Sequence, residues 1–260
     1  MAKRSQYTPG TFSWTDLTTT DQEAAKVFYG GLFGWTADDQ PVGDGFVYSM
    51  MQLSGETVAA ISPQPQQQRE AGVPPAWNSY VTVESADHAL ERAKHLGGTV
   101  HAPAFDVMDA GRMGVVQDPQ GAFFEVWEPK NNPGASLVNG PGALSWNELV
   151  TTDMEASASF YAELFGWSVT PVEGFGMPYM TIQTRDGRTN GGVRAASETE
   201  PCYWLVYFGT DDVQASLARI SELGGNAIMG PMEIGEAMSL GAASDPQGAV
   251  FALYQGRFED

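Results

Sequence analysis

The sequence predicts an α+β protein of two similar domains, each built from two strand–helix–three-strand modules. Three observations support this: an internal repeat spans most of the chain, both copies share one order of strand-like and helix-like segments, and breaker residues separate the copies. A chain of 260 residues can hold two domains of ordinary size, and 42% apolar residues are enough to give each a core.

The internal repeat sets the domain organisation. The segment 14–21 (WTDLTTTD) recurs at 146–153 (WNELVTTD), 32–35 (LFGW) recurs at 164–167, and 118–122 (DPQGA) recurs at 245–249. Ordered matches of this kind indicate a duplicated unit. We therefore expect a first domain over 8–129, a linker over 130–140 whose surroundings are rich in Pro, Asn and Gly, and a second domain over 141–257.

The first module of the first domain begins with a strand and a capped helix. Two-residue alternation places Phe12, Trp14 and Asp16 on one face of the strand and Leu17 on the other. The segment 20–23 (TDQE) matches a capping box with Thr20 at the N-cap, and a glycine at 34 favours the helix end. Apolar runs at 46–53 and 57–61 predict two of the strands that follow.

The second module repeats this order. A strand is expected over 78–83, a helix over about 87–96 that ends at the glycine pair 97–98, and a last strand over 123–127 after the turn sequence DPQG. The second half of the chain carries the same signals, including a second box, TDME, at 152–155. We therefore expect four modules in all.

Composition and charge exclude several classes of function. The net charge of −19 disfavours nucleic acid and anionic membranes as partners, because both are polyanions. The sequence has no apolar run long enough for a membrane span, and its first residues do not resemble a secretion signal. A single cysteine, Cys202, excludes an internal disulfide. We expect a cytoplasmic monomer or homodimer whose partner is a small molecule.

These motifs resemble the vicinal-oxygen-chelate superfamily, which includes glyoxalases, bleomycin-resistance proteins and extradiol dioxygenases. The resemblance rests on a helix that carries Phe-Tyr and ends in LFGW, a helix that ends in Gly-Gly, and the turn DPQG before the last strand. More narrowly, the chain is similar to tandem-domain glyoxalase-like proteins often labelled hydroxylases. The resemblance implies βαβββ modules that pair into open half-barrels, and it leaves lyase, isomerase, dioxygenase-like and purely binding functions open.

Enzymes of this superfamily place a divalent metal on His, Gln or Glu side chains from three strands. The resemblance transfers these positions to Trp14, Asn78 and Glu125 in the first half, and in the second half to 146, 205 and 252, which are Trp, Leu and Ala. None of the six is histidine, and Trp, Leu and Ala cannot ligate a cation. We expect no metal and no other cofactor; a divalent metal at Glu125 is the less favoured alternative.

Four polar residues are candidates for catalysis or ligand binding. Asp16 and Glu148 occupy equivalent places, each two residues after a tryptophan, and either bind or deprotonate a ligand or form structural pairs. Glu125 lies in an apolar strand, where an unpaired carboxylate is costly, so it needs a partner or a raised pKa. Arg112 is the candidate partner, which leaves a structural ion pair, a general base with an oxyanion clamp, and a metal ligand as alternatives for Glu125.

Aromatic and methionine side chains are the candidates for the walls of a ligand pocket. They are either ordinary core residues or stacking surfaces for a small molecule. The set comprises Trp14, Tyr48, Met50 and Trp77 in the first half, and Trp146, Trp204, Tyr179 and Met180 in the second.

Two functions from different classes remain. The first is an enzyme whose first domain binds a small apolar or carbonyl-bearing molecule and uses Glu125 or Asp16 as a base, with Arg112 on developing negative charge. The second is a protein that binds and sequesters a drug or metabolite between aromatic walls without chemistry. A third possibility is that the second domain, which lacks counterparts of Glu125 and Arg112, is purely structural and completes the first cleft or an oligomer interface.

Overall fold

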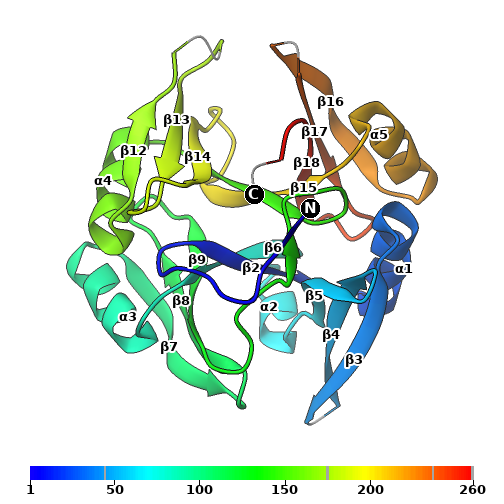
Figure 1. The fold of residues 1–260 in the computed structure, drawn as a ribbon. Helices are drawn as coiled ribbons and strands as arrows, with labels where there is room; N and C mark the ends of the chain where they lie inside the picture. The colour runs from blue at the N-terminus through cyan, green and yellow to red at the C-terminus, as the bar shows by residue number, and fades with distance from the viewer. Residues whose placement is uncertain (44, 174–175, 236, 259–260) are drawn as a thin grey trace.

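A computed structural model describes residues 1–43, 45–173, 176–235 and 237–258. Two eight-stranded mixed sheets, one in each half of the chain, form the body of the molecule (Figure 1). The first sheet has the strand order β3-β4-β5-β2-β6-β9-β8-β7 and the second the order β12-β13-β14-β11-β15-β18-β17-β16. The predicted α+β fold of two repeated domains is therefore confirmed.

The first half contains the first sheet and three helices. Its elements are β2 (Phe12–Thr19), α1 (Gln22–Phe33), β3 (Thr36–Gly43), β4 (Phe46–Leu53), β5 (Glu56–Pro63), α2 (Gln66–Glu70), β6 (Ala76–Thr82), α3 (Ala86–His95), β7 (Thr99–Val107), β8 (Gly111–Gln117) and β9 (Phe123–Pro129).

The second half repeats this order without a counterpart of α2. Its elements are β11 (Leu144–Thr151), α4 (Met154–Phe165), β12 (Ser168–Pro171), β13 (Tyr179–Gln183), β14 (Thr189–Ala195), β15 (Tyr203–Gly209), α5 (Val213–Glu222), β16 (Asn226–Ile234), β17 (Met238–Ser244) and β18 (Val250–Gln255). Two short strands, β1 (Ala2–Lys3) and β10 (Leu137–Val138), pair with each other and tie the N-terminus to the linker.

The helix ends follow from local sequence, with one correction. The N-cap of α1 is Asp21 and not Thr20, because the carboxylate of Asp21 accepts the Ala24 amide hydrogen at 3.0 Å while Thr20 stays outside the helix. In α4 the N-cap is Asp153, which binds the Ala156 amide in the same way. The predicted C-terminal glycine is confirmed: Gly34 has φ 73° and closes α1 on the Gly30 carbonyl.

Strand β2 departs from simple alternation at its start. A register shift between Phe12 and Trp14 interrupts its pairing with β6. As a result Phe12 packs between the two domains, whereas Trp14 packs with residues of the first cleft. The prediction that Phe12 shares a face with Trp14 is wrong for this reason, while Leu17 lies on the opposite face as expected.

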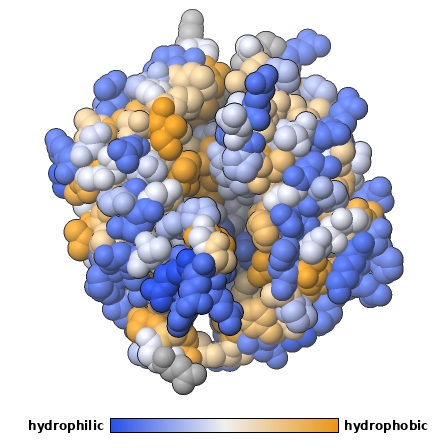
Figure 2. All heavy atoms as spheres, turned by 180° about the vertical axis from the view of Figure 1, so that it is seen from behind, coloured by the Kyte–Doolittle hydropathy of each residue, from blue (hydrophilic) through white to orange (hydrophobic). Residues whose placement is uncertain are grey.

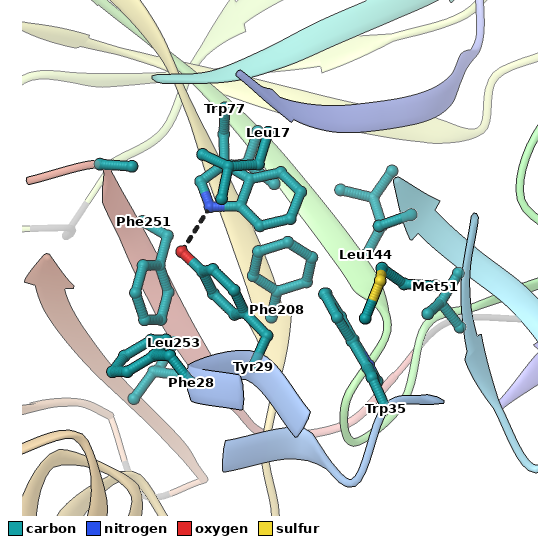
Figure 3. Packing of buried hydrophobic residues seen from close by; sticks show 14 of the residues in the cluster. Leu17, Phe28, Tyr29, Trp35, Met51, Trp77, Leu144, Phe208, Phe251 and Leu253 are labelled. Atoms are coloured by element: carbon teal, nitrogen blue, oxygen red, sulfur yellow. Dashed lines mark hydrogen bonds between the residues drawn. The ribbon is translucent and has the colours of Figure 1, made fainter. Parts of the chain in front are cut away.

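The main cores lie between the domains. One core joins α1 and β5 to β15, α5 and β18, and the other joins α3 and β9 to α4 and β15. In the first, the Trp77 indole N–H donates to the Tyr29 hydroxyl at 2.9 Å (Figure 3), and Tyr29 donates to Asp245 of the other domain at 3.1 Å. The motifs that define the repeat thus form the contact between its copies.

The second core contains the equivalent bridge in reverse. Trp204 donates to Tyr161 at 2.9 Å, and Tyr161 donates to Asp118 of the first domain at 3.0 Å. Trp77 and Trp204 are buried in these cores, so the expectation that they line ligand pockets is wrong. Successive side chains of a strand point to opposite faces of the sheet. Each of these tryptophans is an odd number of residues away from the cleft-facing side chains of its strand, so it faces away from the cleft.

No helix in the described ranges is long and apolar enough to cross a membrane.

We predict that Tyr29→Phe and Tyr161→Phe each lower the free energy of unfolding by about 1–3 kcal/mol, because each leaves a buried indole N–H and a buried carboxylate oxygen without a partner. The two bridges share no residue, so the losses should add to within about 0.5 kcal/mol in the double variant. Urea unfolding measures both. Thr170→Val, which removes an exposed hydroxyl contact, is the control, and equal small effects in all variants would contradict the prediction.

Candidate functional site

The first domain places a buried carboxylate on the cleft side of β2. Asp16 is 5% exposed; its Oδ2 accepts hydrogen bonds from the Tyr48 and Tyr80 hydroxyls, both at 2.9 Å, and its Oδ1 accepts one from the Asn78 amide at 2.8 Å. The Trp14 indole donates to Tyr48 at 3.0 Å. Three hydrogen-bond donors of the protein therefore stabilise the Asp16 carboxylate, although no cation pairs with it among the described residues.

Glu125 lies beside this group without a comparable set of partners. It sits opposite Tyr80 in the parallel pair β6–β9 and is 6% exposed, and its Oε2 is buried with no hydrogen-bond partner in the described part of the chain. Burial raises the pKa of Glu125 well above its ordinary value, and the nearby charge of Asp16 raises it further. When Asp16 and Glu125 lie side by side, the favoured arrangement is therefore a protonated Glu125 beside an ionised Asp16 that accepts three hydrogen bonds.

The predicted contact between Glu125 and Arg112 is wrong. In the β8–β9 pair Arg112 lies opposite Glu128, whereas Glu125 lies opposite Val115. The guanidinium instead binds Asp87 at 2.8 and 3.1 Å and Asp106 at 3.4 Å near the surface. Arg112 thus stabilises the junction of α3 with the β7–β8 hairpin, and its position does not suit it to act on a ligand beside Glu125.

The first cleft is filled by other parts of the chain. Trp14, Tyr80 and Trp127 form one cluster with Tyr7 near the N-terminus and with Ala135 and Val138 of the linker; Ala2, Ala60, Tyr48, Met50, Val107, Ala110 and Met113 also belong to it. The Trp127 indole donates to the Asn132 carbonyl, and Tyr7 donates to the Ala135 carbonyl. These segments pack against the wall of the cleft that carries Asp16 and Glu125, which are 5% and 6% exposed.

The second domain repeats the polar group with a cation added. Glu148 is 4% exposed and stands where Asp16 stands in the first domain. Its Oε1 accepts from the Tyr207 hydroxyl at 3.0 Å and from the Arg194 Nε at 3.0 Å, and Tyr179 forms a further hydrogen bond with it. The Trp146 indole donates to Tyr179 at 3.1 Å, as Trp14 does to Tyr48.

Arg194 links Glu148 to a second carboxylate. Its two terminal nitrogens donate to Glu200 at 2.8 and 2.6 Å. These bonds lower the pKa of Glu200 to about 2. Burial raises the pKa of Glu148, while the charge of Arg194 and the tyrosine hydroxyls act in the opposite direction and favour its ionised form.

A cavity of about 700 Å³ opens over this group in the second domain. Seen from behind, the upper half of the molecule is hollowed between its two arms, with apolar residues at the edge (Figure 2). Glu148, Trp146, Tyr179 and Tyr207 belong to the wall; apolar side chains of β17 and β18 and residues 4–11 of the N-terminal segment complete it. The second domain therefore carries a polar group in a cavity of ligand size, whereas a purely structural role for this domain stays an untested alternative.

The sequence-based candidates are thus divided between two places. Asp16, Asn78, Trp14 and Tyr48 come together in the covered first cleft, with Glu125 and Met50 beside them. Trp146, Glu148 and Tyr179 come together in the second-domain cavity. Met180 packs in the core between the domains.

Sequence analysis missed the two tyrosines that donate to the carboxylates from β6 and β15. Tyr80 and Tyr207 each stand three residues after the tryptophan of a bridge, Trp77 or Trp204, so the repeat itself carried the signal. It also missed Arg194, which has no equivalent arginine in the first half.

The residues present do not fit the superfamily's divalent metal. The Trp14 nitrogen only donates, here to Tyr48, and the Asn78 amide nitrogen donates to Asp16 and Thr18, so an amide oxygen and the Glu125 carboxylate are the ligand atoms left at the three expected places. Leu205 and Ala252 have no donor atoms. In the described ranges no group of three or more His, Cys, Asp or Glu side chains is arranged to hold a metal ion.

We predict that Glu125→Gln stabilises the protein increasingly as pH rises. A raised pKa in the folded state means that folding stability is lost as pH rises through that pKa, and glutamine cannot ionise. The melting temperature of the variant should exceed that of the wild type by at least about 2–4 °C at pH 8, which corresponds to about 1 kcal/mol, and the difference should vanish below the ordinary glutamate value of 4.5. Glu91→Gln on the surface is the control; a pH-independent difference would refute the prediction.

A second prediction concerns Arg194→Met. Without the cation the pKa of Glu148 rises further and that of Glu200 is no longer lowered, so the loss should be largest near neutral pH. We expect about 1–3 kcal/mol, less than for a fully buried pair because Arg194 and Glu200 are partly exposed. The loss should shrink as pH falls from 4.5 towards about 2. Chemical denaturation across pH tests this against Arg219→Met, which removes an exposed pair with Glu222.

Comparisons with known proteins agree with this architecture. The family model described as "Glyoxalase/Bleomycin resistance protein/Dioxygenase superfamily" matches residues 11–126 and 143–253. "Putative glyoxylase CFP32" of Mycobacterium tuberculosis is 43% identical over 97% of each chain. "Anthracycline biosynthesis protein DnrV" of Streptomyces peucetius is 31% identical over 97% of this chain and 96% of its own.

Solved structures of low identity share the fold. The Mn(II)-bound glyoxalase from Novosphingobium aromaticivorans superimposes with a TM-score of 0.66 at 14% identity, over 97% of this chain and 85% of its own. The 2,3-dioxygenase LapB from Pseudomonas sp. KL28 gives 0.64 at 14% identity, over 98% and 96%. Taken with the matches to both halves and to full-length relatives, the chain belongs to the glyoxalase/bleomycin resistance/dioxygenase superfamily.

Proposed function

We propose that this protein binds a small apolar or carbonyl-bearing organic molecule in the second-domain cavity, without the metal site usual in its superfamily. The observation that carries the proposal is the cavity of about 700 Å³, which falls within the size range of small-molecule sites. Its wall combines apolar and aromatic side chains, among them Trp146, Leu240 and Tyr254, with polar side chains in comparable number, among them Glu148. Apolar walls supply binding energy, and the polar groups orient the ligand.

The names of relatives support a small organic ligand. Two relatives are named as glyoxylases and two for anthracycline biosynthesis, and both kinds of name concern small organic molecules. Each of these matches covers 97% of this chain, so both domains lie within the matched region. The ligand we propose is therefore of metabolite size.

Blocking the cavity tests this proposal. The neutral fluorophore N-phenyl-1-naphthylamine, which brightens in apolar sites, should bind the wild type saturably. Leu240→Trp places a large ring in the cavity and should weaken binding at least about tenfold, which corresponds to about 1.4 kcal/mol. Ile228→Trp adds the same side chain at an exposed position and should bind normally. Equal affinity in Leu240→Trp, with unchanged circular dichroism, would contradict the cavity as the site.

Catalysis is the second candidate function, and the position of the Glu148 carboxylate supports it. A general base must be within hydrogen-bond reach of the proton that it removes. The Glu148 carboxylate lies in the cavity wall and can therefore meet this requirement for a bound ligand. A glyoxalase-like lyase or isomerase, or a hydroxylase of the related type, would then replace simple sequestration. Under this candidate the reaction centre is in the second domain, whereas sequence analysis favoured Glu125 and Asp16 in the first.

Glu148→Gln separates catalysis from sequestration. The substitution keeps the shape and the acceptor oxygen for Arg194 and Tyr207, so ligand affinity should be retained. If the protein is an enzyme, turnover of small carbonyl compounds, followed by mass spectrometry, should fall about 10²–10⁴-fold. Saturable binding with no product from the wild type would favour sequestration.

A further inference from the structure

We infer that the ligand of the second-domain cavity is an organic anion, with an apolar body inside the cavity and its negative group at the rim. This inference rests on the proposed function and names the class of molecule. It starts from three arginines, Arg4, Arg188 and Arg257, which all line the cavity. They come from distant parts of the chain: the N-terminal segment, the turn between β13 and β14, and the segment after β18.

The charge of this cavity is opposite to that of the molecule. The chain has a net charge of −19 and only 13 lysines and arginines, yet three of these line one cavity. Glu148 is the sole acidic residue among the described lining residues, and Arg194 pairs with it. In an acidic protein such a local excess of positive charge attracts anions to this cavity and not to the rest of the surface.

The arginines are free to bind a ligand. Neither Arg4 nor Arg257 forms an ion pair within the described ranges, and Arg188 has only a contact of 3.5 Å with Asp186. Arg112, Arg194 and Arg219 by contrast each pair with a carboxylate. A guanidinium recognises carboxylate, sulfonate or phosphate oxygens through two parallel N–H donors.

The backbone holds two of these arginines in place. The Arg4 amide donates to the Ser136 carbonyl at 2.9 Å, next to the paired strands β1 and β10. The Arg257 carbonyl accepts the Tyr254 hydroxyl at 2.8 Å. Tyr254 and Leu240 line the same cavity, so the apolar and the basic parts of the wall adjoin. This juxtaposition fits an amphipathic anion better than a neutral molecule of the same shape.

A pair of matched fluorescent probes tests the inference. 8-Anilinonaphthalene-1-sulfonate carries a sulfonate on the ring system of N-phenyl-1-naphthylamine, which is neutral. The wild type should bind the sulfonate at least several-fold more tightly. In Arg4→Gln/Arg257→Gln the dissociation constant of the sulfonate should rise about tenfold, while that of the neutral probe should change less than about twofold. Raising the salt from about 0.05 M to about 0.5 M should weaken only the sulfonate.

Controls make the outcomes distinct. Arg69→Gln/Arg92→Gln removes the same charge outside the cavity and should leave both affinities unchanged, and Leu240→Trp should weaken both probes. Saturable binding of both probes with equal affinity, or an equal change in the Arg4/Arg257 and Arg69/Arg92 variants, would overturn the inference and leave the proposed function intact. Failure of both probes to bind the wild type would overturn both.

Discussion

The arrangement of the molecule depends on two reciprocal hydrogen-bonded bridges between its domains. One bridge consists of Trp77, Tyr29 and Asp245. The other consists of the equivalent residues with the domains exchanged, Trp204, Tyr161 and Asp118. Each aspartate also accepts the backbone amides of its own turn, so it fixes the turn and the neighbouring domain together. Because the domains meet through these buried faces, their clefts open separately, and Asp16 and Glu148 belong to different sites.

The two clefts share one arrangement of hydrogen-bonded residues and differ in a few side chains. Both have a tryptophan, two tyrosines and a carboxylate in the same bonded order. In the first, Trp127 binds the linker carbonyl of Asn132 and the linker fills the cleft. In the second, Ala252 stands at the place of Glu125, and Tyr254, at the place of Trp127, makes an edge-to-face contact with Phe258 at the cavity edge. A covered site and an accessible site have thus arisen from one ancestor.

Sequence predicted what depends on local and repeated patterns. The repeat, the glycine helix ends and the inward position of Trp14, Asp16 and Glu148 are of this kind. Contacts between distant segments could not be predicted. Arg112 binds Asp87 and Asp106 because the β8–β9 register places it away from Glu125, and the cavity wall includes residues of the N-terminal segment, such as Arg4 and Tyr7. The position of Trp77 was predictable from parity, because the adjacent Asn78 faces the cleft.

The buried carboxyl groups of Glu125 and Glu148 differ in what compensates them, which supports the proposal of a ligand site in the second cleft. A carboxylate removed from water is stabilised by a proton, by a cation or by hydrogen-bond donors such as those around Asp16. In the first cleft no cation pairs with Glu125 among the described residues, and its raised pKa favours the protonated form; residues of the linker pack in the neighbouring cluster. In the second, Arg194 compensates Glu148, which can remain ionised beside a cavity and in contact with a ligand. The arginine that sequence analysis missed is therefore what allows a charged group to be kept at an accessible site.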